Sequence, residues 1–259
     1  MPDFENLTEL EQRILGMVET RPSPGKHAAR SAIHHAERAR RIQGIDPEMA
    51  LFRALTGEEE AARAIIHSLH RLRYPGAERL NWKVHRHKAA MIPFLAAVGG
   101  LIKKGPITVP QLQIVQRDGK DQPSVRFEFM LPDGQVVGVT PRPPLDLQLS
   151  VNDALHDFSP ELDELLVDSA VKSLDKMIEL RATERNGVLY ATESGVPTIT
   201  GDIAPAIEVR RGNIFACIAV FLLVDTFQVH QRFVLQCLPT YLKMLSLLPP
   251  PTGVEPEAS

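Results

Sequence analysis

The stretch PEMALFRALTGEEEAARAIIHSLHRL, residues 47–72, decides the fold because its pattern is that of a long helix with one acidic interruption. Asp46 precedes Pro47, and a capping acid followed by proline is a typical helix start. Positions that step by four and three residues trace one face, which reads Leu51, Leu55, Glu58, Ala62, Ile65 and Leu69. We therefore predict an apolar stripe with a single carboxylate, that of Glu58, in its middle.

The segments around this stretch also have helical periodicity. We predict helices over about 7–19, 25–42, 47–72 and 77–98, which are separated by short breaks at proline and glycine. Short loops between helices of this length favour antiparallel packing. Residues 1–105 are therefore predicted to form an antiparallel four-helix bundle.

The pattern changes after residue 105. Residues 106–151 hold alternating or β-branched runs separated by the turn sequences RDGKD and PDG, so we predict a small antiparallel β meander. Residues 152–248 return to helix, and they include a long apolar helix over about 213–247 that is expected to pack on the bundle. The tail, 249–259, is expected to be disordered. The predicted fold class is mainly α, with the meander as an α+β insert.

Charge is distributed unevenly along the chain. The net charge is −3, yet residues 1–104 hold 17 Lys and Arg against 12 Asp and Glu, and the remainder holds 12 against 20. Seven of the nine histidines also lie before residue 88. This asymmetry fits a polyanionic partner, or attraction between the two parts of the chain.

The sequence has no feature that indicates export or membrane insertion. Its start, MPDFENLTELEQ, is acidic and polar, which is unlike a signal peptide. The longest uncharged runs, 89–102 and 213–224, fall short of the roughly 20 residues that span a bilayer. Two cysteines are too few for a disulfide framework. We expect a cytoplasmic protein that has no membrane partner.

A buried carboxylate needs a partner, because an unpaired charge in an apolar interior is costly. The apolar stripes of the predicted helices 25–42 and 77–98 carry His35 and His87, and both fall within about one turn of Glu58 when residues are counted from the loops. We predict a polar layer of His35, Glu58 and His87. It is either a hydrogen-bonded cluster that fixes helix register or a ligand set for one metal ion. No Glu-x-x-His motif of a di-iron bundle occurs, and we expect neither metal nor other cofactor.

The predicted helix 77–98 has a second, polar face. Asn81, His85 and Lys88 share this face, and Arg79 lies beside it. The face is either solvated or functional. In the functional interpretation His85 transfers a proton, and Arg79, Asn81 and Lys88 position and neutralise a phosphate.

Two motifs on consecutive predicted helices, TGEEEAAR (56–63) and RLNWKVHRHK (79–88), resemble the helical HEPN superfamily, in particular its AbiV-like, abortive-infection branch. The resemblance covers about residues 25–100. It implies a metal-independent endoribonuclease that acts as a homodimer on RNA in bacterial defence or stress, with Arg79 and His85 as the Arg-(four to six residues)-His pair. The family motif places a polar residue directly after the arginine. Here Leu80 stands at that position and Asn81 follows it.

Two other functions fit the sequence. One is a non-catalytic dimeric scaffold in which the apolar segment IFACIAVFLLVDTFQ (214–228) forms the dimer core or packs on the bundle. The other is a helical bundle that binds a metal or a small ligand at His35, Glu58 and His87.

Overall fold

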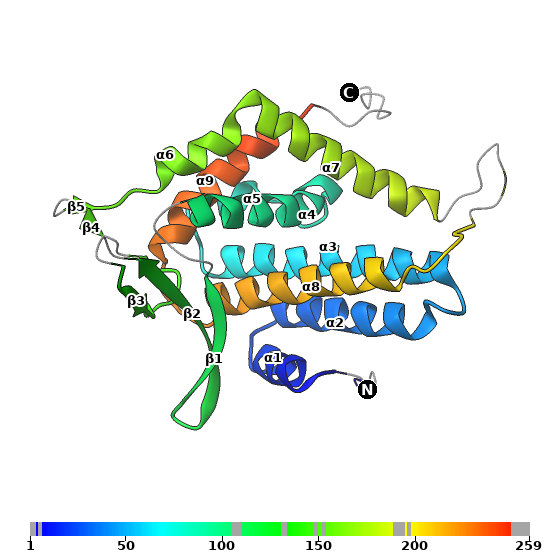
Figure 1. Cartoon of the computed structure of the whole chain (residues 1–259), viewed down its shortest axis with the longest axis horizontal. Coiled ribbons are helices and arrows are strands. Elements are labelled where there is room, and N and C mark those ends of the chain that lie inside the picture. Colours follow the sequence, from blue (N-terminus) through cyan, green and yellow to red (C-terminus); the bar gives the residue numbers. More distant parts are fainter. Residues whose placement is uncertain are drawn as a thin grey trace.

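A computed structural model of the chain describes residues 4, 7–104, 110–130, 134–147, 150–151, 154–188, 195 and 198–249. These residues are mainly helical and include a small antiparallel sheet (Figure 1). The mainly helical fold class with a β insert is thus confirmed. No helix in the described part of the chain has the length and apolar character that crossing a membrane requires.

The α-helices are α1 Glu9–Glu19, α2 Gly25–Ile42, α3 Pro47–Arg71, α4 His85–Ala89, α5 Met91–Lys104, α6 Ser159–Asp163, α7 Asp168–Gly187, α8 Ala204–Asp225 and α9 Arg232–Leu247. Two 3-10 helices are η1 Ala77–Arg79 and η2 Glu164–Leu166. The strands are β1 Gln111–Arg117, β2 Lys120–Met130, β3 Val136–Val139, β4 Ser150–Val151 and β5 Ala154–Leu155.

α3 begins at its predicted cap, and α1 also begins at a side-chain cap. The Asp46 side chain accepts a hydrogen bond from the N–H of Met49 at 2.9 Å, and Pro47 occupies the first turn of α3. At α1 the hydroxyl of Thr8 accepts from the N–H of Glu11, whose carboxylate accepts from the N–H of Thr8. Each of these bonds satisfies a backbone donor that the helix leaves without an internal partner.

The predicted helix over 77–98 is wrong, because η1 is followed by a non-helical turn before α4 and α5 begin. The Asn81 side chain explains the interruption. Its oxygen accepts from the backbone N–H of Lys83 at 2.9 Å, and the backbone N–H of Asn81 donates to Nδ1 of His87 at 2.9 Å. These bonds give the backbone of the turn an alternative to helical pairing, as asparagine often does.

The single apolar helix predicted over 213–247 is also wrong. It is two helices, α8 and α9, and α8 begins at Ala204. The buried side chain of Gln231 holds the connection between them, since its Nε2 donates to the carbonyl of Leu223 at 2.8 Å and its Oε1 accepts from the N–H of Leu145 at 2.8 Å. Arg71 of α3 fixes the end of α8 by donating to the carboxylate and the carbonyl of Asp225.

The helices are arranged in layers. α2, α3 and α8 lie side by side, with α1 beneath them and with α4, α5, α7 and α9 above them in the view of Figure 1. The central place of α8 was not predicted, and the bundle of four N-terminal helices is not confirmed. The main hydrophobic core of the described residues has buried members from Leu7 to Leu248. A smaller cluster of Ala39, Ala50, Ala54 and Ile207 lies between α2, α3 and α8.

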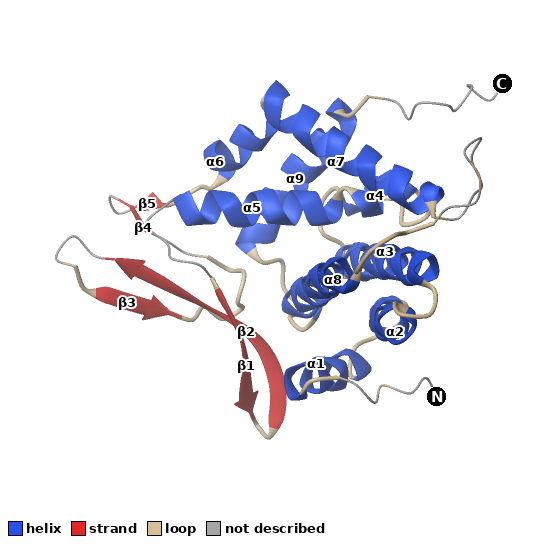
Figure 2. Cartoon of the chain, turned by 45° about the vertical axis from the view of Figure 1, so that its right-hand side comes forward, coloured by secondary structure: helices blue, strands red, loops and turns tan. Residues whose placement is uncertain are grey.

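The sheet lies at one end of the helical layers (Figure 2). Its order is β1-β2-β3, with both pairs antiparallel, so that Gln111 faces Arg126 and Phe127 faces Val139. Val125 and Phe127 of β2 are buried in the core, whereas every residue of β3 is exposed. The predicted meander is therefore present. Of the tail that was predicted to be disordered, residues 250–259 lie outside the described residues.

Candidate functional site

Glu58 is buried in the middle of α3, as its place in the apolar stripe predicts. Its side chain is 2% exposed. The carboxylate accepts hydrogen bonds from three side chains, those of Arg181 at 2.6 Å, Arg210 at 3.0 Å and Asn213 at 2.8 Å. Its partners thus come from α7 and α8, at the far end of the sequence, and they satisfy the charge by pairing and by hydrogen bonds.

The predicted polar layer does not form, because His35 and His87 make no hydrogen bond with Glu58. The turn before α4 moves His87 away from the predicted stripe, and its Nδ1 accepts from the N–H of Asn81. Nδ1 of His35 is buried and has no hydrogen-bond partner in the described part of the chain. Burial, together with the charge of Arg53 and the neighbouring His34, lowers the pKa of His35 to about 4, so the imidazole is neutral near pH 7.

Two of the four predicted catalytic residues converge on one carboxylate. Nδ1 of His85 lies 2.9 Å and Nζ of Lys88 lies 3.2 Å from Oε2 of Glu59. Burial of Glu59 opposes ionisation, but the hydrogen bonds and charges of His85 and Lys88 outweigh that effect and lower the pKa of the carboxyl. The pairing fixes the imidazole ring of His85 while leaving the residue about half exposed.

The other two predicted residues do not join this cluster. Arg79 is exposed in η1, and its guanidinium makes no hydrogen bond or ion pair with the described residues. The Asn81 side chain accepts from the backbone of the turn. The structure therefore brings together His85 and Lys88, and it leaves Arg79 and Asn81 in contact with solvent.

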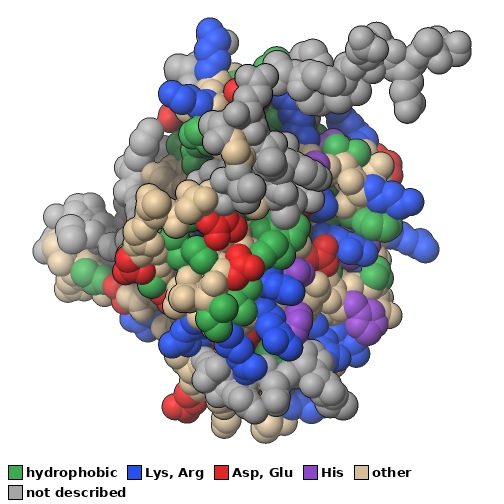
Figure 3. All heavy atoms as spheres, turned by 90° about the vertical axis from the view of Figure 1, so that its right-hand side faces the viewer, with side chains coloured by type: hydrophobic (Ala, Val, Ile, Leu, Met, Phe, Trp, Pro, Cys, Tyr) green, Lys and Arg blue, Asp and Glu red, His purple; other side chains and the backbone are tan. Residues whose placement is uncertain are grey.

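Lys, Arg and His side chains are numerous on one face of the molecule, where Asp and Glu side chains also lie (Figure 3). Figure 3 shows Lys, Arg and His side chains on the face where α2 ends and α3 begins. Many of these cations have acidic partners, such as Arg40 with Glu208 and Arg63 with Glu60. Ion pairs of this kind neutralise part of the positive charge of residues 1–104.

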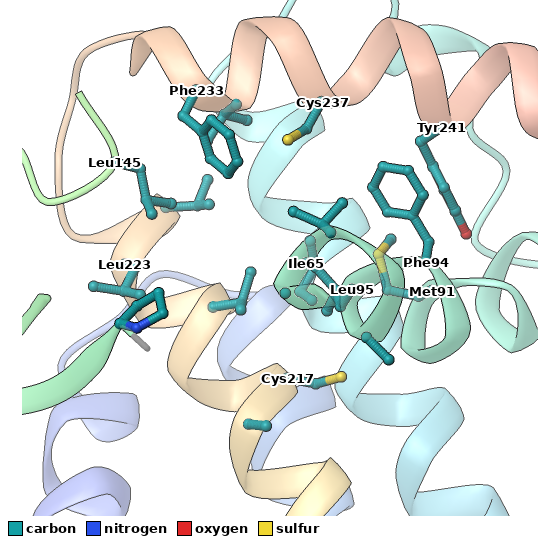
Figure 4. Close-up of a pocket in the computed structure, with 18 of the residues that line it drawn as sticks. Ile65, Met91, Phe94, Leu95, Leu145, Cys217, Leu223, Phe233, Cys237 and Tyr241 are labelled. Carbon is teal, nitrogen blue, oxygen red and sulfur yellow. The ribbon is translucent and has the colours of Figure 1, made fainter. Parts of the chain in front are cut away.

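A cavity of about 410 Å³ lies between the helical layers, and sequence reasoning missed it. Side chains of α3, α5, α8 and α9 and of the first two strands form its wall. Figure 4 shows Cys217 of α8, Phe233 and Cys237 of α9, and Phe94 and Leu95 of α5 around this space. Two exposed alanines, Ala96 and Ala216, also line it, so the cavity reaches the surface between α5 and α8.

The wall is almost entirely apolar. Its polar side chains are engaged elsewhere, since Asn213 donates to Glu58 and the hydroxyl of Tyr241 donates to the carbonyl of His87 at 2.5 Å. Burial raises the pKa of each of the two thiols, Cys217 and Cys237, to about 12. Both sulfurs therefore behave as neutral, weakly polar groups, and the cavity offers contact surface rather than reactive chemistry.

The sequence carried only an indirect signal for this cavity. The apolar runs 89–102 and 213–224 correspond to most of α5 and to much of α8, and both contribute to its wall. An apolar run predicts burial, but it does not indicate whether the facing side chains fill the space between helices. That depends on packing between segments that are distant in the chain.

No protein-family model, curated protein or solved structure matches this chain. In the described residues, no group of three or more His, Cys, Asp or Glu side chains is placed to hold a metal ion. The HEPN resemblance stays a prediction.

Proposed function

We propose that this protein binds a small apolar molecule in the cavity between α3, α5, α8 and α9. The observation that supports the proposal is the cavity itself, with its volume of about 410 Å³ and its apolar wall. Ligand sites typically measure about 300–1,000 Å³ and are lined mainly by hydrophobic and aromatic side chains. An apolar cavity of about 150 Å³ already holds benzene, so this one has room for a larger molecule such as a medium acyl chain or a fused ring system.

The chemistry of the wall restricts the ligand. A charged group inside the cavity would lose its hydration without gaining a partner, which is costly. The ligand is therefore uncharged, or it keeps a charged end outside the opening at Ala96 and Ala216. Aromatic side chains such as Phe94 and Phe233 provide flat contact surface, and the sulfurs adapt to irregular shapes.

A fluorescent apolar probe tests this proposal. N-phenyl-1-naphthylamine should bind the purified protein saturably at one site per chain, and medium-chain alcohols should displace it. Ala216→Trp places a large ring at the exposed opening and should weaken probe binding at least about tenfold, because the ring occupies the entrance. Ala206→Trp, at an exposed position near the start of α8, is the matched control and should bind as the wild type does. Equal binding by the two variants would contradict the proposal.

A second candidate function is the metal-independent cleavage of RNA that the HEPN resemblance implies. The observation in its favour is the hydrogen bond between His85 and Glu59, since a carboxylate that orients an imidazole is a common arrangement for a general base. Arg79, exposed nearby in sequence, would neutralise charge on the phosphate.

The ribonuclease proposal is tested on a mixed RNA pool in the presence of EDTA. Wild-type protein should cleave it, and His85→Ala should reduce the rate by about 100-fold or more. His27→Ala, an exposed histidine on α2, is the control and should cleave normally. Cleavage that survives His85→Ala would remove His85 from the reaction.

A further inference from the structure

A group of basic side chains lies outside the cavity and outside α4, where α2 approaches its end and α3 begins. On α2, His34, Arg38 and Arg41 are spaced by four and three residues and so share one face. Arg53 lies on the adjoining part of α3. We call His34, Arg38 and Arg53 the α2–α3 patch.

The packing of the two helices brings Arg38 and Arg53 within electrostatic range of the same imidazole, that of His34. α2 and α3 are antiparallel and approach closely at Gly57, where an added Cβ would lie 3.2 Å from Cβ of His35. One turn back along α3 from Gly57 is Arg53, and one turn forward along α2 from His34 is Arg38. The pKa of His34 is consistent with this proximity, because burial lowers it and the charges of Arg38, Arg53 and Arg41 lower it further.

Among the described residues, no acidic side chain pairs with either arginine of the patch. Arg38 and Arg53 make no hydrogen bond or ion pair with any described residue. In contrast, Arg30 on the same helix pairs with Glu19 at 2.9 Å. Neighbouring guanidinium groups repel each other, and an anion bound between them would relieve that repulsion.

We propose that the α2–α3 patch binds the phosphate backbone of a single-stranded nucleic acid. A guanidinium presents a planar fork of donors that matches phosphate oxygens. The face of α2 that carries His34, Arg38 and Arg41 is about 10 Å long at 1.5 Å per residue, which suits a row of phosphates rather than one anion. The proposal is independent of the cavity and of the reaction considered for His85.

The burial of α2 argues for nucleic acid over an anionic membrane. A helix that lies on a membrane inserts an apolar face between the lipids. The apolar face of α2, which includes Ala32, Ile33 and Ala36, is fully covered by the protein core. The patch therefore offers charge without an apolar face to insert.

Fluorescence anisotropy with a labelled oligouridylate tests the patch. Three full-length proteins are compared over a series of salt concentrations: wild type, Arg38→Gln/Arg53→Gln, and the control Lys176→Gln/Lys243→Gln, which removes two charges from exposed lysines of α7 and α9. The patch variant should bind at least about tenfold more weakly, and its slope of log K against log salt should be shallower by about 1.4, because each phosphate contact contributes roughly 0.7. The control should match wild type. Circular dichroism and thermal unfolding verify that all three proteins are folded.

Several results would overturn the proposal. One is that the patch variant and the control bind equally. Another is that wild type does not retain the oligouridylate at low salt, or that it sediments with phosphatidylserine vesicles without binding the oligonucleotide. A third is that Arg79→Gln/His85→Ala abolishes binding while the patch variant binds normally, which would assign RNA binding to the region around α4.

Discussion

At the scale of single residues, Glu58 is where charges from three helices meet. A carboxylate of α3 accepts from guanidinium groups of α7 and α8 and from the amide of Asn213, so neither the acid nor the cations are buried alone. Removing one member of such a group lowers the free energy of unfolding by more than the intact group contributes to it. The reason is that the remaining charged or polar side chains stay buried without a partner.

Glu58→Gln should therefore be strongly destabilising. We expect the free energy of unfolding to fall by about 3 kcal/mol, the lower end of the range for broken buried pairs, because Arg181 and Arg210 keep some contact with water. Urea unfolding of the variant and of Glu19→Gln measures this. Glu19 pairs with Arg30 at the surface, so its loss should cost less than about 1 kcal/mol. Similar losses in both variants would mean that Glu58 is not an important ion-pair partner.

The buried His67 should make stability depend on pH. Burial, with the charges of Arg63 and His70, lowers the pKa of His67 to about 4 in the folded state, whereas an unfolded histidine titrates near about 6.5. Between these two pKa values the unfolded state binds more protons than the folded state. The contribution of His67 to the free energy of unfolding is therefore fully present above about pH 6.5 and is lost as the pH falls toward 4. His67→Gln should reduce the slope of unfolding free energy against pH by about 1 kcal/mol per unit in this window.

The control for this prediction is His27→Gln, since His27 is exposed on α2. Urea unfolding at several values between pH 7 and pH 4.5 gives the slope for each protein. The slope of His27→Gln should equal that of wild type. An unchanged slope in His67→Gln would show that the histidine does not stay neutral in the folded protein.

At the scale of elements, the sequence predicted α1, α2 and α3 well because their limits depend on local chemistry. The Thr8 cap involves Glu11 and the Asp46 cap involves Met49, so each cap lies within a stretch of four residues. Such short-range signals can be recognised without knowledge of the fold. The break at Asn81 and the end of α8 at Asp225 were missed. The first depends on a bond to His87 and the second on Arg71 of α3, and neither partner is identified by periodicity.

Gly57 has a structural role at the element scale, because it lets three helices approach one another. A Cβ there would lie 2.7 Å from Cδ1 of Ile214 in α8 and 3.2 Å from the carbonyl oxygen of Ala32 in α2. The isoleucine can move, but the backbone oxygen of a packed helix moves only at a cost in energy. The glycine therefore allows α2, α3 and α8 to form one tight layer.

Gly57→Ala should lower the free energy of unfolding by about 1 kcal/mol, because overpacking of about 1–3 kcal/mol exceeds the helix-propensity gain of roughly 1 kcal/mol. Gly212→Ala is the matched comparison, since an added Cβ there has no atom within 4 Å. It should raise stability by about 0.5–1 kcal/mol. Denaturant unfolding of both variants gives the two signs, and a stabilising Gly57→Ala would contradict the close approach.

At the scale of the whole molecule, the cavity and the core are products of long-range packing. The wall of the cavity combines helices from both halves of the chain with strands that lie between those halves in the sequence. Glu58 illustrates the same limit, because its position in a stripe predicted that it would be buried and need a partner. The identity of the partners, more than 120 residues away, did not follow from spacing in neighbouring helices.

The central position of α8 leads to a prediction about fragments. Its fully buried side chains Ile214, Ile218 and Phe221 belong to the same core as α2 and α3. A fragment of residues 1–105 would expose the surfaces of those helices that α8 covers, so we expect it to lack a cooperative unfolding transition and to bind the dye ANS. Far-ultraviolet circular dichroism during urea titration, compared with the full chain, measures this. A sharp transition in the fragment would show that residues 1–105 fold as an independent unit, with α8 docked on a core that is already complete.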